Sequence, residues 1–126
     1  MSDESFVVAV IDDDEILRET LRSLLSAHDY EVELYDSAEA FLAAVGASKA
    51  NCLLVDVYLG GISGIELGRG LAAAGFRFPI IYMTGSTDET VRARAMQAGC
   101  VAFLTKPLTP PALDEALMAA RRKRRS

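Results

Sequence analysis

At 126 residues the chain has room for one domain, because compact domains commonly hold about 100–150 residues. Its 51% hydrophobic and 25% charged residues are typical of globular proteins and exclude the disordered class. The net charge of -5 is uneven, because the basic tail at 121–125 holds many of the 13 basic residues and the remainder is acidic enough to repel nucleic acid.

No apolar run approaches the roughly 20 residues needed to cross a bilayer. Residues 1–5 are acidic where a secretory signal would be basic. We therefore expect a cytoplasmic protein without membrane contact. We expect no direct nucleic-acid binding by this domain, and any DNA contact would come from the tail or from a DNA-binding domain downstream in the full gene. Cys52 and Cys100 fit neither a CxxC nor a zinc spacing, which predicts free thiols.

The sequence alternates apolar strands with amphipathic helices along its length. The continuous β-branched run from Phe6 to Ile11 is typical of a strand covered on both faces. Apolar residues at helical spacing follow it, from Ile16 to Leu25. This pattern repeats, and it predicts strands at 6–11, 31–35, 52–56, 79–84 and 101–105. The predicted helices lie near 16–28, from 37 to 45, at 64–74, directly after 86–89 and near 110–121.

Sequence signals mark where several helices begin. The segments SGIE at 63–66 and STDE at 86–89 each match a capping box, in which a serine and a later glutamate exchange bonds with the backbone. Thr109 is expected to cap the last helix, with Pro110 in its first position. The expected inward residues of the second helix and the expected core methionines are Ala38, Phe41, Leu42, Val45, Met83, Met96 and Met118.

Five strands that alternate with five helices predict parallel pairing, because a right-handed crossover helix returns each strand to the same end of the sheet. The expected fold class is α/β, a doubly wound (βα)5 sandwich around a parallel five-stranded sheet. We assign residues 1–120 to this one domain and residues 121–126 to a basic tail or the start of a linker.

Polar side chains follow four of the predicted strands. Asp12 and Asp13 come after the first, Asp56 ends the third, Thr84 ends the fourth and Lys106 follows the fifth. The carboxyl ends of parallel strands share one edge of the sheet, where ligands bind. We therefore expect these groups to converge there.

Clustered carboxylates need compensation, because two unit charges about 4 Å apart repel by roughly 4 kcal/mol at an effective dielectric of 20. A divalent cation such as Mg²⁺ would supply it, as would a raised pKa on one acid or a salt bridge to Lys106. Asp56 is the best candidate for a nucleophile that forms an acyl phosphate. An acidic run before a helix also serves the helix dipole, and we assign Asp14 and Glu15 to that purpose.

The segments VIDDDE, LLVDVYLGGISGIEL, IIYMTGS and AGCVAFLTKPL resemble, in order and interval, the receiver domains of two-component response regulators, the CheY-like family. The resemblance covers about residues 7–119 and implies the flavodoxin-like strand order 2-1-3-4-5. It implies that Asp56 accepts a phosphoryl group from a sensor histidine kinase or a phosphotransfer protein. Thr84 would then follow the phosphoryl group and Lys106 would hold one of its oxygens.

The resemblance also implies a site for Mg²⁺ or Mn²⁺. Asp13 would bind the ion directly, Asp12 through water, and Asp56 and the backbone carbonyl of Tyr58 would complete the protein ligands. The family usually has a methionine and a proline in the loop where this chain has Leu59-Gly60-Gly61. Glycines widen the allowed backbone conformations, so we expect a more mobile loop. We also hypothesise that Tyr58 screens the acyl phosphate from water.

Phe103 matches the aromatic switch position of the family, although a simple core position is an equally good interpretation. Switching with Thr84 would change the surface formed by the fourth helix, fifth strand and fifth helix, which is also the face for a phosphorylation-dependent homodimer.

Two alternatives stay open from the residues. An aspartyl-phosphate phosphotransferase or phosphatase typically has a second aspartate two residues after its nucleophile, where this chain has Tyr58, so we do not expect an enzyme. A flavin-binding domain of flavodoxin type would need glycine and hydroxyl donors in the first loop, which is acidic here.

Overall fold

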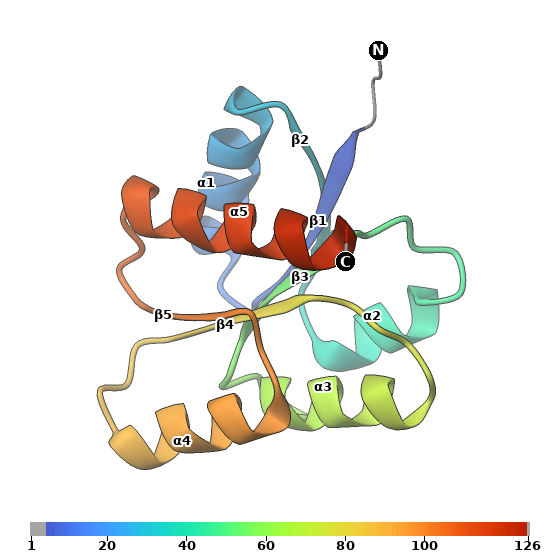
Figure 1. The fold of residues 1–126 in the computed structure, drawn as a ribbon, viewed down its shortest axis with the longest axis vertical. Coiled ribbons are helices and arrows are strands. Elements are labelled where there is room, and N and C mark those ends of the chain that lie inside the picture. The colour runs from blue at the N-terminus through green and yellow to red at the C-terminus, as the bar shows by residue number, and fades with distance from the viewer. Residues whose placement is uncertain (1–4, 126) are drawn as a thin grey trace.

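The computed structural model describes residues 5–125, which form five strands and five helices that alternate along the chain (Figure 1). The strands are β1 (Phe6–Ile11), β2 (Tyr30–Tyr35), β3 (Cys52–Asp56), β4 (Ile80–Thr84) and β5 (Ala102–Thr105). The helices are α1 (Glu15–Ala27), α2 (Ala38–Ala44), α3 (Gly64–Ala73), α4 (Glu89–Ala98) and α5 (Pro110–Arg125). None of the helices within residues 5–125 has the length and apolar character needed to span a membrane.

All the strands are parallel and lie in the order β2-β1-β3-β4-β5, so the predicted doubly wound fold is confirmed. In the register, Val10 lies between Leu34 of β2 and Leu54 of β3. This order places the ends of β1 and β3 side by side at the centre of the sheet. The point at which the strand order reverses therefore falls between these two strands.

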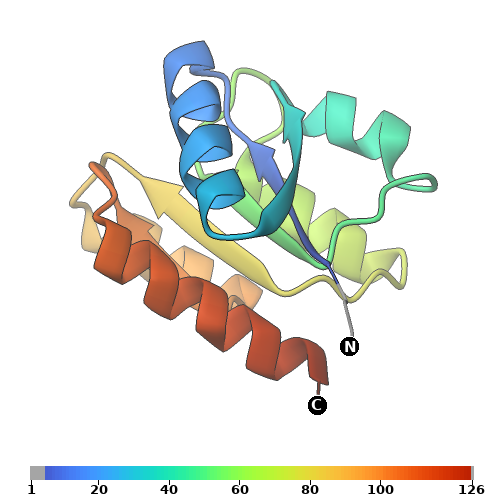
Figure 2. The same ribbon diagram turned by 90° about the horizontal axis from the view of Figure 1, so that it is seen from above.

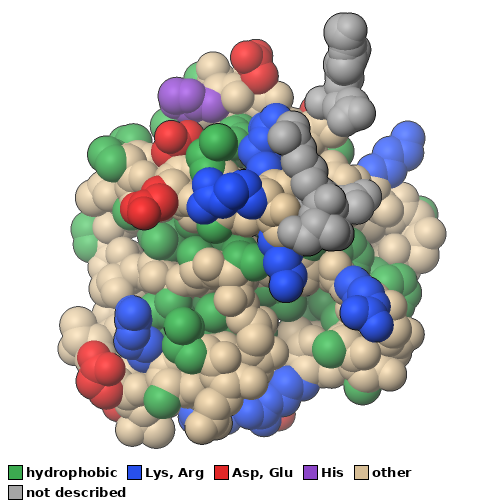
Figure 3. Space-filling model, viewed as in Figure 1, with side chains coloured by type: hydrophobic (Ala, Val, Ile, Leu, Met, Phe, Trp, Pro, Cys, Tyr) green, Lys and Arg blue, Asp and Glu red, His purple; other side chains and the backbone are tan. Residues whose placement is uncertain are grey.

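The helices form a layer on each face of the sheet. Helices α1 and α5 cover one face, and α2, α3 and α4 cover the other (Figures 1 and 2). Alternate residues of β1 point to opposite layers, so Val8 and Val10 pack with α1 and α5 whereas Ala9 and Ile11 pack with the other three helices. Figure 3 shows that basic side chains are scattered over the side of the molecule seen in Figure 1.

The predicted capping box of α3 is confirmed, since Ser63 and Glu66 exchange bonds with each other's backbone. The one predicted for α4 is wrong. Asp88 caps that helix by accepting from the Thr90 N–H at 2.8 Å, and Ser86 accepts from the Asp88 N–H in the preceding turn. An aspartate caps a helix as well as a serine does, so two capping residues competed for this start.

Helix α5 continues to Arg125 instead of ending near Arg121. The basic run contains no glycine or proline, and lysine and arginine are good helix formers, so nothing in the sequence stops the helix there. Three residues expected in the core are exposed: Leu42, Met96 and Met118. Leu42 and Met96 lie on outer faces of helices that each bury only two residues, so their apolar stripes are narrower than predicted.

Candidate functional site

The carboxyl edge of the sheet brings together polar groups from four strands. Asp12 directly follows β1, Asp56 and Thr84 are the last residues of β3 and β4, and Lys106 directly follows β5. Asp12 and Thr84 are fully buried and Asp56 is 6% exposed, whereas most other buried side chains in the described part of the chain are apolar. Buried carboxylates are costly unless they are paired, so this edge is the chemically distinctive part of the molecule.

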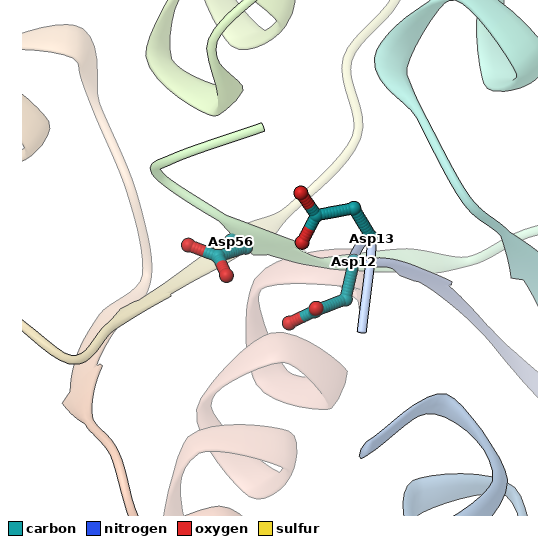
Figure 4. A group of neighbouring side chains, drawn as sticks. All are labelled: Asp12, Asp13 and Asp56. Atoms are coloured by element: carbon teal, nitrogen blue, oxygen red, sulfur yellow. The ribbon is translucent and has the colours of Figure 1, made fainter. Parts of the chain in front are cut away.

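Three carboxylates form a cluster at the centre of this edge. Asp12, Asp13 and Asp56 each present an oxygen, and these oxygens lie within 4.8 Å of one another. Figure 4 shows the three side chains at the ends of β1 and β3, with their carboxylates extended to the same side. Asp13 is exposed whereas the other two are buried, so the cluster opens to solvent on the side of Asp13.

Lys106 bridges two of the acids. Its Nζ lies 2.9 Å from Oδ2 of Asp12 and 2.6 Å from Oδ2 of Asp56. Burial alone would lower the pKa of Lys106, but the hydrogen bonds to Asp56 and Asp12 outweigh it and raise this pKa. Burial raises the pKa of Asp56, with a further contribution from the charge of Asp12, and Lys106 offsets only part of that effect. The salt bridge and the raised carboxyl pKa therefore occur together.

Backbone amides fix the orientation of both buried carboxylates. The Tyr58 N–H donates to Oδ1 of Asp56 at 2.8 Å, and the Asp14 N–H donates to Oδ1 of Asp12 at 2.8 Å. Arg18 donates from Nη1 to the backbone carbonyl of Asp12 at 2.8 Å. Sequence reasoning missed Arg18, because a bond from the second turn of a helix back to the preceding loop has no residue signature.

Asp14 has the structural function that the sequence predicted. Its carboxylate caps α1 by accepting from the N–H groups of Ile16 and Leu17, at 3.0 and 3.2 Å. Glu15 lies in the first turn, where an acid is favourable to the helix dipole. The acidic run is thus divided into two parts: Asp12 and Asp13 belong to the carboxylate cluster, and Asp14 and Glu15 stabilise the start of α1.

Thr84 and Phe103 lie on the neighbouring strands β4 and β5. The Thr84 Oγ1 accepts from the Ser86 N–H at 3.1 Å, and the Lys106 N–H donates to the Thr84 carbonyl at 2.8 Å. Phe103 is half-buried, and the Arg92 guanidinium lies 5.5 Å from the centre of its ring. Phe103 therefore contacts α4 on one side, and the Arg92 contact could not be predicted from residue spacing.

The donor set of the acidic cluster fits a hard divalent cation. All three side chains offer carboxylate oxygens, which Mg²⁺ and Mn²⁺ prefer, and their spacing allows one ion to contact more than one of them. Cys52 and Cys100, the softer ligands, are free cysteines that begin β3 and precede β5 at the opposite edge of the sheet. The chemistry of this edge is thus that of oxygen ligands beside a lysine.

Comparison with known families supports a single assignment. The family model described as "Response regulator receiver domain" matches residues 8–118, which is most of the chain. The chain belongs to this family. As a receiver domain of two-component systems it is a signal-transduction module, and the comparisons give no support to the alternative of a phosphotransferase or phosphatase.

Curated relatives of this receiver domain include two kinds of regulator. The response regulator protein TodT of Pseudomonas putida is 38% identical over 120 residues, which cover 95% of this chain and 53% of the relative. The transcriptional regulatory protein FixJ of Azorhizobium caulinodans is 40% identical over 117 residues, which cover 93% of this chain and 56% of the relative. The chain therefore spans about half the length of the curated relatives it matches.

Solved structures agree with this receiver fold. The crystal structure of FixJ-N has a TM-score of 0.88 at 32% identity and covers 95% of this chain and 96% of that one. Full-length FixJ from B. japonicum has a TM-score of 0.89 at 36% identity, covering 97% of this chain and 60% of that one.

Proposed function

We propose that Asp56 of this receiver domain accepts a phosphoryl group from a phosphohistidine on a sensor kinase or a phosphotransfer protein. The observation that carries the proposal is the position of the Asp56 carboxylate, which bonds the Lys106 ammonium and lies beside the oxygens of Asp12 and Asp13. A nucleophilic carboxylate needs nearby positive charge to approach an anionic phosphoryl group, and it needs to be oriented. Lys106 supplies the charge and the Tyr58 N–H fixes one carboxylate oxygen.

In the proposed reaction an oxygen of Asp56 attacks phosphorus and an acyl phosphate P–O bond forms. The P–N bond breaks, and the imidazole leaves with its electron pair. The Asp56 carboxylate loses its charge in this step, so Lys106 releases it and pairs with a phosphoryl oxygen instead. The Thr84 hydroxyl donates to a second phosphoryl oxygen, since it ends the neighbouring strand.

Asp12, Asp13, Asp56 and the backbone carbonyl of Tyr58 would hold Mg²⁺, or Mn²⁺ in its place. When bound, the ion neutralises negative charge on the phosphoryl group. Asp13 is the exposed member of the cluster and is therefore the direct ligand in this proposal, with Asp12 acting through water because Lys106 already occupies one of its oxygens.

The output follows from movement of Thr84 toward the phosphoryl group, with Phe103 filling the space behind it. This changes the surface of α4, β5 and α5, through which a homodimer would form. The FixJ relatives are named transcriptional regulatory proteins, and this chain spans about half of their length, which supports a DNA-binding domain as the output in a longer cytoplasmic protein.

The test is incubation with Mg²⁺ and phosphoramidate or acetyl phosphate, followed by intact mass. We expect a gain of one phosphoryl group in the parent and in Asp36→Asn, an exposed aspartate that follows β2 at the same edge and serves as the control. Asp56→Asn should gain none. Modification that persists in Asp56→Asn would refute the proposal, and turnover of many organophosphates per chain would favour the enzyme alternative.

A further inference from the structure

The β3–α3 loop has an anchor outside the acidic cluster. This loop, residues 57–63, carries Tyr58 and the pair Gly60-Gly61, and it passes beside the start of α2 (Figure 2). Glu39, in the first turn of α2, accepts a hydrogen bond from the Ile62 N–H at 3.1 Å. The two residues are 23 positions apart in the sequence, so the bond joins two separate elements.

Gly61 is fitted to the Glu39 carboxylate. A Cβ placed on Gly61 would overlap the Glu39 carboxylate, Oε2 above all, so a side chain there would displace the acceptor of the Ile62 bond. The described glycines with positive φ are Gly75 and Gly99, so Gly61 is not needed for an unusual backbone conformation. Its missing side chain makes room for Glu39.

The same loop is tied to the nucleophile at its other end. The Tyr58 N–H donates to Asp56, and the Gly64 N–H donates to the Val57 carbonyl at 2.9 Å. The segment from Leu59 to Gly61 thus lies between the Tyr58 bond to Asp56 and the Ile62 bond to Glu39. A loop with two adjacent glycines has much conformational freedom to lose, and a second anchor removes part of that cost before a ligand binds.

We propose that Glu39 is a positioning residue for the metal site: it holds the Ile62 N–H, and so restricts the loop whose Tyr58 carbonyl is a proposed ligand. This inference rests on the proposed function, because it concerns the same site. In this proposal Glu39 on α2 restricts the loop, a function that a stiffer loop sequence would otherwise have. Glu39 acts through the loop and does not contact the acidic cluster.

The primary test is the Kd for Mg²⁺, measured by NMR titration of backbone amides in the full chain. We expect Glu39→Ala to raise this Kd by about three- to tenfold, which corresponds to the loss of one hydrogen bond. Glu39→Gln should stay near the parent, because its amide oxygen still accepts. Glu115→Ala removes an exposed glutamate from α5, on the other layer, and is the control for charge.

Hydrogen exchange at the Ile62 amide gives a readout that does not depend on the metal. It should quicken in Glu39→Ala, and the thermal midpoints of the variants should show that each is folded during the titration. If the parent binds Mg²⁺ and Glu39→Ala has the same Kd, the proposal that Glu39 positions the loop is overturned, while the proposed function stands. A parent that binds no Mg²⁺ would overturn both.

A double-mutant cycle separates the loop anchor from a general effect. Gly61→Ala should displace the Glu39 carboxylate and raise the Kd as much as Glu39→Ala does. The double variant should be no weaker than either single variant, because both remove the same contact. Effects that multiply in the double variant would mean that the two residues act separately, and would overturn the proposal.

Discussion

At the scale of single residues, the Tyr82 hydroxyl is the exception to the pairing of buried polar groups. Tyr82 is fully buried in β4, and within the described part of the chain its hydroxyl is the buried side-chain atom without a hydrogen-bond partner. Burial raises its pKa to about 12. Gly68 of α3 accommodates the group, since a Cβ there would overlap the hydroxyl. A glycine at position 68 of α3 therefore leaves space for the Tyr82 hydroxyl, although this hydroxyl forms no hydrogen bond with any described residue.

Removing that oxygen should stabilise the protein. We expect Tyr82→Phe to raise the free energy of unfolding by about 1 kcal/mol, because it removes the desolvation penalty of an unpaired buried hydroxyl. Urea unfolding measures the change, and phosphorylation should be unaffected. Gly68→Ala should destabilise the parent but be better tolerated together with Tyr82→Phe, because the hydroxyl that the new methyl group would overlap is then gone. A loss of stability in Tyr82→Phe would show that the hydroxyl is satisfied in solution.

The sequence predicted which side chains converge at the carboxyl edge of the sheet, but it did not predict the contacts that hold the surrounding loops. Asp12, Asp13, Asp56 and Lys106 were identified because each ends or follows a strand, and parallel strands share one carboxyl edge. Glu39 was not identified, since its partner is a backbone amide and any residue other than proline at position 62 would offer one. Contacts to the backbone leave no pattern in the sequence of the partner.

At the scale of elements, Glu33 connects β2 to the segment that leads into β3. Its carboxylate accepts from the Ser48 hydroxyl at 2.7 Å, from the Tyr35 hydroxyl at 2.8 Å and from the Lys49 N–H at 2.9 Å. Partial burial alone would raise the pKa of Glu33, but these hydrogen bonds outweigh it and lower the pKa below its usual value. The folded state therefore favours the ionised form of Glu33.

A lowered carboxyl pKa stabilises the fold above the unfolded-state value near 4.5 and stops doing so as the pH falls through the folded-state value. Glu33→Gln should thus cost about 1 kcal/mol at neutral pH, and this difference from the parent should shrink as the pH falls below 4.5 and through the lowered folded-state pKa of Glu33. Urea unfolding of both proteins across this range measures it. Glu31→Gln, on the same strand, controls for loss of charge. A difference that stays constant with pH would contradict the prediction.

The sequence predicted which elements form and in what order, but not all of their ends. The start of α4 was misplaced because serine and aspartate both cap helices well, and the sequence offers Ser86 and Asp88. In the structure the Ser86 N–H donates to the Thr84 hydroxyl and the Ser86 hydroxyl accepts from the Asp88 N–H, so Ser86 belongs to the turn before the helix and Asp88 is the cap. The end of α5 was misplaced because a charged run is compatible with both helix and tail. Local sequence signals therefore locate the end of a helix reliably only where a single residue nearby is suited to cap or stop it.

At the scale of the whole molecule, Lys106 joins parts of the chain that are far apart in sequence. Its partners Asp12 and Asp56 lie 94 and 50 positions away, after β1 and at the end of β3. The order of the strands predicts that these groups meet, but it does not say which acid the lysine bonds. In the structure Lys106 bonds both acids, so its ammonium group and a metal ion would compete for the same carboxylate oxygens.

Replacement of Lys106 should therefore make the stability of the protein depend more strongly on Mg²⁺. Without the ion, Lys106→Met should lose about 2 kcal/mol of unfolding free energy, because Asp12 and Asp56 stay buried without their cation. Saturating Mg²⁺ should then stabilise the variant more than the parent, since the ion no longer competes with an ammonium group. Urea unfolding with and without Mg²⁺ measures both effects, and Lys123→Met, an exposed lysine near the end of α5, is the control. Equal stabilisation of parent and variant by Mg²⁺ would mean that the lysine and the ion bind independently.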